Sequence, residues 1–170
     1  FDRLFAMAEF RRKPLIRLRR AVEKQVFESC GCQVLLGGPG RGGSPLQQAL
    51  RRDIVRARSV RILVAYFLPT RRLRNALVRA ARRGAAVDLI LPGRSDVALS
   101  KLATESLYRR LLRAGIRILE YQPQMLHGKL FIVDDAVYVG SSNLDPRSLR
   151  LNYEVTVRLE GREIADAARA

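Results

Sequence analysis

The sequence has no tryptophan, one histidine and two cysteines among its 170 residues. Cys30 and Cys32 lie too close along the chain to bond each other readily, and two cysteines cannot form a disulfide framework. A structural zinc site takes four Cys or His ligands, and the single histidine lies far away, at position 127. No apolar run approaches the ~20 residues that a membrane-spanning helix needs. Arginine and lysine also interrupt the N-terminal segment, so we expect no signal peptide there.

Acidic residues are scarce as well. The chain has 16 Asp and Glu against 32 Lys and Arg, a formal net charge of +16, and only four of the basic residues are lysine. Such an excess predicts an anionic partner: nucleic acid, an acidic membrane surface or a phosphorylated substrate. Aromatic residues make up only 6%, which leaves few platforms for stacking bases and makes nucleic acid the less favoured partner. The 48% of hydrophobic residues is typical of one globular domain.

The N-terminal part of the chain reads differently from the rest. Apolar residues recur at roughly helical spacing over residues 1–27, with arginines between them, which predicts a helix interrupted near Pro14. This helix would dock on a neighbouring domain, which we favour, or lie on anionic lipid. A short strand over 33–36 and a Gly- and Pro-rich turn follow. We expect residues 1–34 to be a helical remnant or linker from a preceding half, and residues 35–170 to be the main domain.

After the turn, helices alternate with nearly continuous apolar strands. Because such strands are typical of a sheet covered by helices, the predicted fold class is α/β, with a mixed, largely buried β-sheet flanked by helices. A hairpin around Asp134 and Asp135 makes the sheet mixed. The predicted helices cover 45–57, 71–83, 98–114 and a short C-terminal segment, and the predicted strands cover 60–67, 86–91, 116–121, 130–133, 136–139 and about 152–158.

Residues that can carry chemistry gather in one stretch, HGKLFIVDDAVYVGSSNLDPRSLRLNYE, residues 127–154. His127 stands two residues before Lys129, and positions i and i+2 of a strand share a face. The turn Gly-Ser-Ser-Asn at 140–143 follows the next strand and can bring Asn143 and a serine hydroxyl close to the histidine. The sequence therefore predicts one cluster of imidazole, ammonium and amide.

This cluster suits a phosphodiester substrate. A lysine and an amide held in place stabilise the charge that attack at phosphorus puts on the phosphoryl oxygens, and they need no metal to do so. Histidine can attack phosphorus itself, giving a phosphohistidine, or can protonate the leaving oxygen. Glu154 is a candidate to fix the tautomer of the imidazole. Each residue alone has an ordinary structural explanation, such as a surface histidine or a turn aspartate, but the combination favours phosphorus chemistry.

The pattern His127-x-Lys129-x4-Asp134, followed by Gly-Ser-Ser-Asn, resembles the signature of the phospholipase D superfamily. The longer string MLHGKLFIVDD, together with AYFLPT (65–70), LPGRSD (91–96) and NLDPRSL, is similar to the second half of bacterial cardiolipin synthases. The resemblance covers roughly residues 33–158.

The resemblance implies a role for each matching residue. His127 would be one of two active-site histidines, acting as nucleophile or as general acid. Lys129 and Asn143 would bind the phosphoryl oxygens. Asp134 would support the motif structurally, and Glu154 would orient the imidazole.

Other matching residues would bind substrate. Ser141 or Ser142 would assist at the phosphoryl oxygens. Tyr66, Phe67 and Pro69 would lie near the mouth of the site, where the head group or glycerol enters. No metal or organic cofactor is implied.

The superfamily's site uses two copies of the motif, which face each other across a twofold or pseudo-twofold axis. This chain has one histidine and one motif, so the second must come from a missing first half, which we favour, or from a second copy of the chain.

The resemblance implies phosphatidyl transfer through a phosphohistidine, most simply cardiolipin synthesis from phosphatidylglycerol or a related phospholipid. Such an enzyme would act on anionic phospholipid, peripheral to or anchored at the cytoplasmic face of a bacterial inner membrane. Two alternatives stay open: a metal-independent phosphodiesterase or nuclease of the same superfamily, with water as acceptor, and a non-catalytic half-domain that only binds anionic surfaces.

Overall fold

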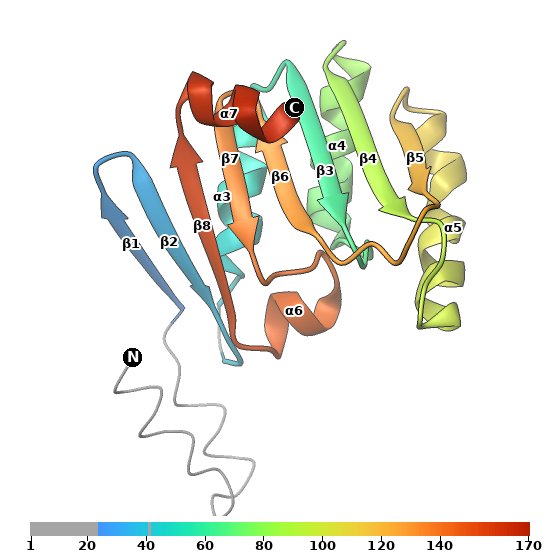
Figure 1. The fold of residues 1–170 in the computed structure, drawn as a ribbon, viewed down its shortest axis with the longest axis horizontal. Helices are drawn as coiled ribbons and strands as arrows, with labels where there is room; N and C mark the ends of the chain where they lie inside the picture. The colour runs from blue at the N-terminus through green and yellow to red at the C-terminus, as the bar shows by residue number, and fades with distance from the viewer. Residues whose placement is uncertain (1–23, 41) are drawn as a thin grey trace, which may run out of the picture.

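A single mixed β-sheet forms the centre of the molecule. In the computed structural model, which describes residues 24–40 and 42–170, the sheet has eight strands in the order β1-β2-β8-β7-β6-β3-β4-β5 (Figure 1). The strands are β1 Gln25–Ser29, β2 Cys32–Gly37, β3 Ser59–Val64, β4 Ala86–Pro92, β5 Arg117–Tyr121, β6 Lys129–Val133, β7 Ala136–Gly140 and β8 Glu154–Glu160.

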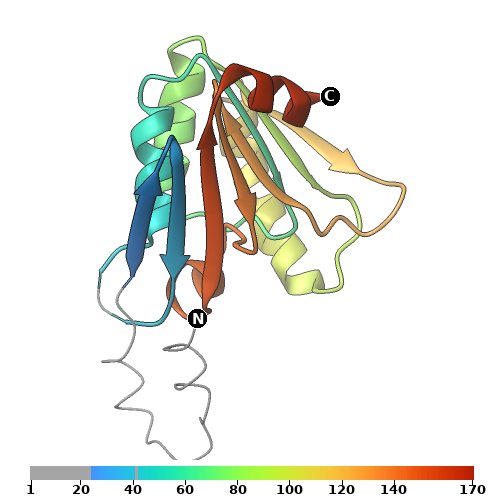
Figure 2. The same cartoon turned by 60° about the vertical axis from the view of Figure 1, so that its left-hand side comes forward.

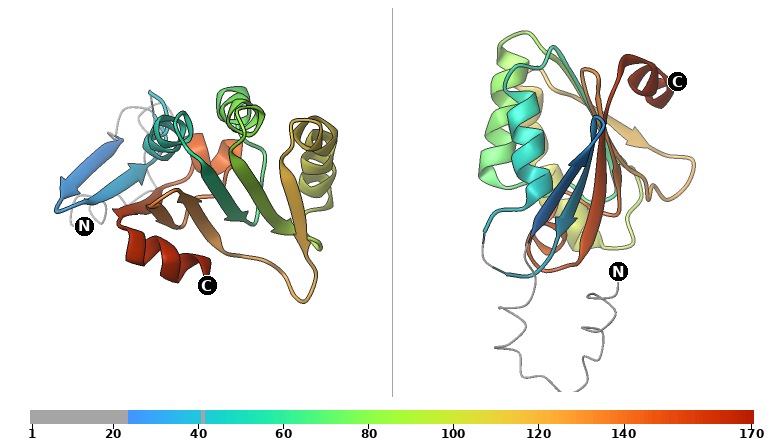
Figure 3. Two further views of the ribbon diagram at one scale, coloured as in Figure 1. Left: turned by 90° about the horizontal axis from the view of Figure 1, so that it is seen from above. Right: turned by 90° about the vertical axis from the view of Figure 1, so that its left-hand side faces the viewer.

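Helices cover both faces of this sheet. The helices α3 Pro45–Ile54, α4 Arg71–Arg82 and α5 Ala98–Leu112 lie on one face, and α7 Arg162–Arg169 lies on the other (Figure 3). The main core fills the space between the sheet and α3 and α4, where Leu50, Ile62, Leu77, Leu89 and Phe131 are at most 1% exposed. The predicted fold class, a mixed α/β sheet flanked by helices, is confirmed.

The order of the strands follows from the way the chain connects them. β3, β4 and β5 pair in parallel, and α4 and α5 provide the crossovers that parallel strands require. β6 then pairs antiparallel with β3, and the hairpin partner β7 joins it to β8. The hairpin around Asp134 and Asp135 is therefore where the sequence predicts it.

The predicted helix over residues 1–27 is wrong where the structure describes it. Residues 25–29 form β1, and the two-residue turn Cys30–Gly31 has φ of 47° and 75°, as a tight hairpin requires. The segment QVFES alternates well enough to pair as a strand, and β2 then pairs antiparallel with β8. Residues 1–23 lie outside the described residues. The sheet thus extends N-terminal of residue 34, while the origin of residues 1–34 in a preceding half stays a prediction.

A short helix, α6 Pro146–Arg150, replaces the loop that the sequence predicts there. Asp145 is its N-cap and accepts hydrogen bonds from the backbone N–H groups of Arg147 (2.7 Å) and Ser148 (3.2 Å). Pro146 occupies the first helical position, which favours a helix start. The helix α6 lies at the bottom of the sheet in Figure 1.

One edge of the sheet gathers the segments that carry the motif. β3, β4 and β7 end there, and β6 and β8 begin there (Figure 2). We call it the site edge; it is the lower edge in Figure 1. In open α/β sheets, ligands bind outside the carboxyl ends of the parallel strands, which is this edge.

Candidate active site

Lys129 opens β6 at the site edge, where it pairs with Val64, the last residue of β3. His127 comes before the strand because β3 offers no further residue for it to pair with. The expectation that histidine and lysine share a strand face is therefore wrong. Instead, the Lys129 ammonium donates a 2.6 Å hydrogen bond to the backbone carbonyl of His127, which holds the two residues together. The imidazole itself is exposed.

Lys129 is half-buried, and its surroundings affect its charge. Burial lowers the pKa of the Lys129 ammonium, and the negative charge of Glu154 opposes that shift. The negative charge of Glu154 therefore favours the protonated form of the Lys129 ammonium.

Glu154 opens β8 and is buried. Its carboxylate accepts hydrogen bonds from the Ser141 hydroxyl and, at 3.3 Å, from the Asn152 amide. No hydrogen bond joins Glu154 to His127 within residues 24–40 and 42–170, so the orientation of the imidazole by Glu154 stays a prediction.

The Gly-Ser-Ser-Asn turn is held tightly against β8. Gly140 leaves no room for a side chain, since an added Cβ would overlap the backbone of Val155 and Thr156. This close approach lets the Ser141 N–H donate to the Val155 carbonyl (2.9 Å), while the Ser141 hydroxyl accepts from the Val155 N–H (3.1 Å). Ser141 is thus fixed to the backbone of Val155 by one backbone and one side-chain hydrogen bond.

The next two residues of the turn are buried but differ in their partners. The Ser142 hydroxyl accepts a 3.0 Å hydrogen bond from the buried Thr156 hydroxyl, so Ser142 already has a structural partner. Asn143 is only 9% exposed, and its buried Oδ1 has no hydrogen-bond partner among the residues that the structure describes. Buried polar groups are almost always paired, so an unpaired amide at this edge needs an explanation.

The loop after β3 runs beside the turn that carries Asn143. The Leu68 N–H donates to the Leu144 carbonyl (2.8 Å), and the Leu144 N–H donates to the Tyr66 carbonyl (3.2 Å). These bonds fix Tyr66 next to the Asn143 segment. Phe67 is only 1% exposed, and Pro69 is also buried. The expectation that Phe67 and Pro69 line an entrance for substrate is therefore wrong, because their side chains support the loop from inside.

Tyr66 faces a shallow hollow together with His127. Its hydroxyl donates a 2.6 Å hydrogen bond to the Asp96 carboxylate, and that bond is the main cause that raises the pKa of Tyr66. Arg94, Asp96 and Met125 line the same hollow. Arg94 and Asp96 were not predicted as site residues, although the string LPGRSD at the carboxyl end of β4 is a position where ligand-binding loops occur.

Asp134 lies at the other end of β6, about 16 Å from Lys129 at the usual rise of a strand. Its carboxylate accepts hydrogen bonds from the backbone N–H groups of Arg58 (3.1 and 3.2 Å) and Ser59 (2.8 Å). Its φ of 49° suits the hairpin turn. Asp134 thus fastens the hairpin to the start of β3 and cannot touch a substrate at His127.

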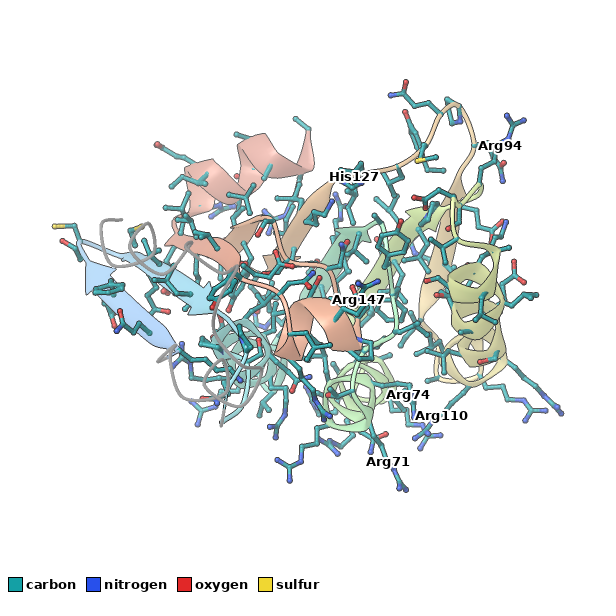
Figure 4. All side chains as sticks on the ribbon, turned by 90° about the horizontal axis from the view of Figure 1, so that it is seen from below. Arg71, Arg74, Arg94, Arg110, His127 and Arg147 are labelled. Carbon is teal, nitrogen blue, oxygen red and sulfur yellow. The ribbon has the colours of Figure 1, made fainter. Side chains whose placement is uncertain are left out.

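Arginine surrounds the site edge. In the view from below, Arg147 of α6 lies between His127 and Arg71 and Arg74 of α4, and Arg94 lies to the right of His127 (Figure 4). No group of three or more His, Cys, Asp or Glu residues in the described part of the chain could hold a metal ion. Nor does any helix of that part have the length and apolarity to cross a bilayer. The site edge therefore presents a histidine, a lysine and arginines to an anionic ligand.

Known proteins share both the sequence and the fold. Cardiolipin synthase A of Buchnera aphidicola subsp. Acyrthosiphon pisum (strain APS) is 35% identical over 149 residues, which is 86% of this chain and 31% of that protein. Cardiolipin synthase B of Escherichia coli (strain K12) is 42% identical over 113 residues, 66% of this chain and 27% of that protein. The chain therefore spans less than a third of the length of these relatives.

Among solved structures, Nuc from Salmonella typhimurium, a phospholipase D family member, matches with a TM-score of 0.65 and 23% identity. The match covers 81% of this chain and 90% of that one. This likeness shows that the two proteins have the same fold. Residues 50–170 match the family described as "Cardiolipin synthase, PLD-like domain". The chain belongs to this family of phospholipase D-like domains.

Proposed function

We propose that the site edge transfers a phosphatidyl group through a covalent intermediate on His127, making cardiolipin from phosphatidylglycerol or a related phospholipid. The family membership and the relatives named cardiolipin synthase support this reaction. The observation that carries the proposal is the arrangement of an exposed imidazole, a half-buried ammonium and a buried amide at one edge of the sheet. The enzyme would work at the cytoplasmic face of a bacterial inner membrane, where its +16 charge suits anionic lipid.

The proposed reaction has two displacements at phosphorus. A ring nitrogen of His127 attacks the phosphodiester of the first phosphatidylglycerol, and the P–O bond to the terminal glycerol breaks. The leaving oxygen takes a proton from a general acid, so that glycerol departs and phosphatidyl-histidine remains. A hydroxyl of a second phosphatidylglycerol then attacks phosphorus and gives its proton to the same group. The P–N bond breaks, cardiolipin leaves and the imidazole is free again.

Lys129 and Asn143 are proposed to stabilise the charge that builds on the non-bridging oxygens. The ammonium can reach them as a point charge, since it is already held at the His127 carbonyl. The Asn143 amide can donate its N–H to a phosphoryl oxygen, while its buried Oδ1, an acceptor, would need a donor such as a substrate hydroxyl. Glu154 keeps the site balanced in charge through its effect on Lys129 and its bond to Ser141.

The general acid is proposed to be a second histidine on another copy of the motif. The chain has only one histidine, which cannot attack phosphorus and protonate the leaving glycerol in the same step. His127 is exposed, so a second half can approach it. We favour a half that precedes residue 1 over a second copy of this chain.

The test is an assay of this domain together with the half that carries the second motif, on phosphatidylglycerol vesicles in buffer containing a chelator. Cardiolipin and free glycerol should appear in equal amounts, and quenching with denaturant at alkaline pH, where a P–N bond survives, should trap a phosphatidyl group on His127, detected by mass spectrometry. Phosphatidic acid in place of cardiolipin would show that water is the acceptor, and cleavage of plasmid DNA would favour a nuclease. A His127→Ala variant that still makes cardiolipin at the original rate would rule out the proposed nucleophile.

A further inference from the structure

A second hollow at the site edge lies away from His127. It is a groove of about 600 Å³, a size within the usual range for small-ligand sites. We call it the basic groove. Its lining comes from the segment before α3, from the N-terminal ends of α3 and α4, and from the end of α6: Lys24, Gly40, Gly42, Gly43, Ser44, Gln47, Thr70, Arg71, Arg72, Leu149 and Arg150.

The charge of the basic groove is one-sided. Four of its residues are cationic, and no acidic residue lines it in the part of the chain that the structure describes. Neither Arg71, Arg72 nor Arg150 forms an ion pair with any described carboxylate. Some arginines elsewhere are paired: Arg117 and Arg158, for example, are held by Asp88 and Asp53 at 2.7 and 2.8 Å. The groove therefore concentrates positive charge that the fold does not neutralise.

Lys24 shows the effect of this concentration. Burial lowers the pKa of its ammonium, and the positive charge of Arg150 lowers it further. The same ammonium donates a 2.6 Å hydrogen bond to the Gly42 carbonyl, so Lys24 is fixed on the wall of the groove. Two cations thus repel each other across a hollow whose described lining has no acidic residue.

Two helices add to this field. α3 and α4 both begin at the groove, with the caps Ser44 and Thr70, and neither has an acidic residue in its first turn. A hydrogen bond from the Gln47 amide to the Thr70 hydroxyl ties the two helix starts together. The positive ends of both helix dipoles are therefore uncompensated and reinforce the cationic side chains.

We propose that the basic groove binds the phosphodiester head group of an anionic phospholipid, separate from the one that reacts at His127. The guanidinium groups of Arg72 and Arg150 match phosphate oxygens in geometry as well as in charge. The groove shares no lining residue with the hollow at His127, and α6 contributes Leu149 and Arg150 to the groove alone. The choice of a lipid phosphate over a free one rests on the proposed function.

This site would give the enzyme a second point of attachment to the membrane. Helix α6 begins just after the turn that carries Asn143, and it ends at Arg150 in the groove. Lipid bound in the groove would therefore affect the position of the Asn143 turn. A head group held there keeps the site edge facing the membrane while substrate and product exchange at His127. The groove is thus a binding site and contributes no group to the chemistry.

The test measures binding in a His127→Ala background, so that turnover plays no part. Vesicles of phosphatidylglycerol and of phosphatidylcholine are titrated into this protein and into its Arg72→Gln/Arg150→Gln derivative. At the usual contribution of basic residues near an anionic surface, the double change should weaken binding to phosphatidylglycerol about thirtyfold. The matched control is Arg109→Gln/Arg113→Gln, a double change of two exposed arginines at the end of α5, at the opposite edge of the sheet. It should weaken binding less than about threefold. Equal losses in the two variants would overturn the proposal, because binding would then follow net charge alone.

Two competitors identify the ligand. If inorganic phosphate at millimolar concentration displaces the protein from vesicles, the groove recognises the phosphate group itself. Displacement only by glycerophosphoglycerol would show that it reads the lipid head group, and both results support the site. A DNA duplex that binds more tightly than the vesicles, through the same two arginines, would overturn the assignment to lipid. All these measurements use the His127→Ala protein. If the groove does not bind lipid, the proposed reaction at His127 is unaffected, and if that reaction does not occur, lipid binding in the groove is unaffected.

Discussion

The two ends of β6 carry the two halves of one motif and are built in opposite ways. At the site edge, Lys129 has one hydrogen bond to a neighbouring carbonyl, His127 is exposed and Asn143 has a buried oxygen with no partner among the described residues. At the opposite edge, both oxygens of Asp134 accept backbone hydrogen bonds, and its own N–H donates to the Ser59 carbonyl at 3.0 Å. The site edge therefore has polar groups that can still bind a ligand, whereas the polar groups of Asp134 are already hydrogen-bonded within the fold.

This difference separates chemistry from folding within a single sequence signature. Polar groups that are satisfied inside the fold contribute to its stability and gain little from a ligand. Polar groups that lack a partner are the ones for which a ligand can supply the missing interaction. We therefore expect changes at the site edge to reduce activity at nearly constant stability, and changes at Asp134 to do the reverse.

The largest effect is expected for His127→Ala. Without the imidazole there is no nucleophile, so cardiolipin formation should fall at least about a thousandfold. The melting temperature should stay within about 1 °C, because an exposed side chain with no structural partner is removed. Gln124→Ala, an exposed neighbour in the same loop, is the matched control and should keep full activity. A large loss of stability in His127→Ala would mean that the site edge is structural after all.

Asp134→Ala should have the next largest effect, on stability. It leaves the N–H groups of Arg58 and Ser59 without their acceptor and places alanine at a φ of 49°, so unfolding should become easier by about 3 kcal/mol. Urea denaturation measures this change. Asp135→Ala, at the exposed next position, should cost less than about 1 kcal/mol. If purified Asp134→Ala were fully stable but inactive, the division between the two ends would fail.

Lys129→Gln should lower kcat/KM about a hundredfold by removing charge from the phosphoryl oxygens. The pH profile tests the same residue without removing it. Burial lowers the pKa of the Lys129 ammonium, so the charge is lost, and activity falls, at a lower pH than for an ordinary lysine. In Lys129→Arg, the alkaline fall should move to higher pH, because a guanidinium stays protonated. An alkaline limb that does not move would assign it to another group.

The sequence predicted much of the sheet because apolar runs flanked by turn residues leave few alternatives. The strands around Ile62, Leu89 and Phe131 and the hairpin at Asp134 are in the structure. β1 was missed because its short alternating segment continues a run of apolar residues at helical spacing. α6 was missed although Asp145 and Pro146 are a good helix start, since five residues give no periodicity to detect.

At the site, sequence reasoning identified the residue types but not their surroundings. Lys129, Asn143 and Glu154 do gather at one edge, because the ends of β6, β7 and β8 meet there. Phe67 was misplaced because nothing in AYFLPT shows which side chain turns inward. Arg94 reaches the hollow at His127 only through the packing of two loops, which no local pattern encodes.

The smallest effect is expected for Tyr66→Phe, which tests whether the loop after β4 is part of the site edge. The change removes the hydrogen bond to Asp96 and with it about 1 kcal/mol that holds the wall of the hollow. A looser wall should raise KM about fivefold and leave kcat nearly unchanged, because no group that touches phosphorus is altered. Tyr108→Phe removes the same kind of bond, from Tyr108 to Glu120 at 3.1 Å, on α5 and β5. It should change neither constant. If both variants raised KM equally, the Tyr66 hydroxyl would be stabilising the fold in general, and the hollow would have no part in binding the head group.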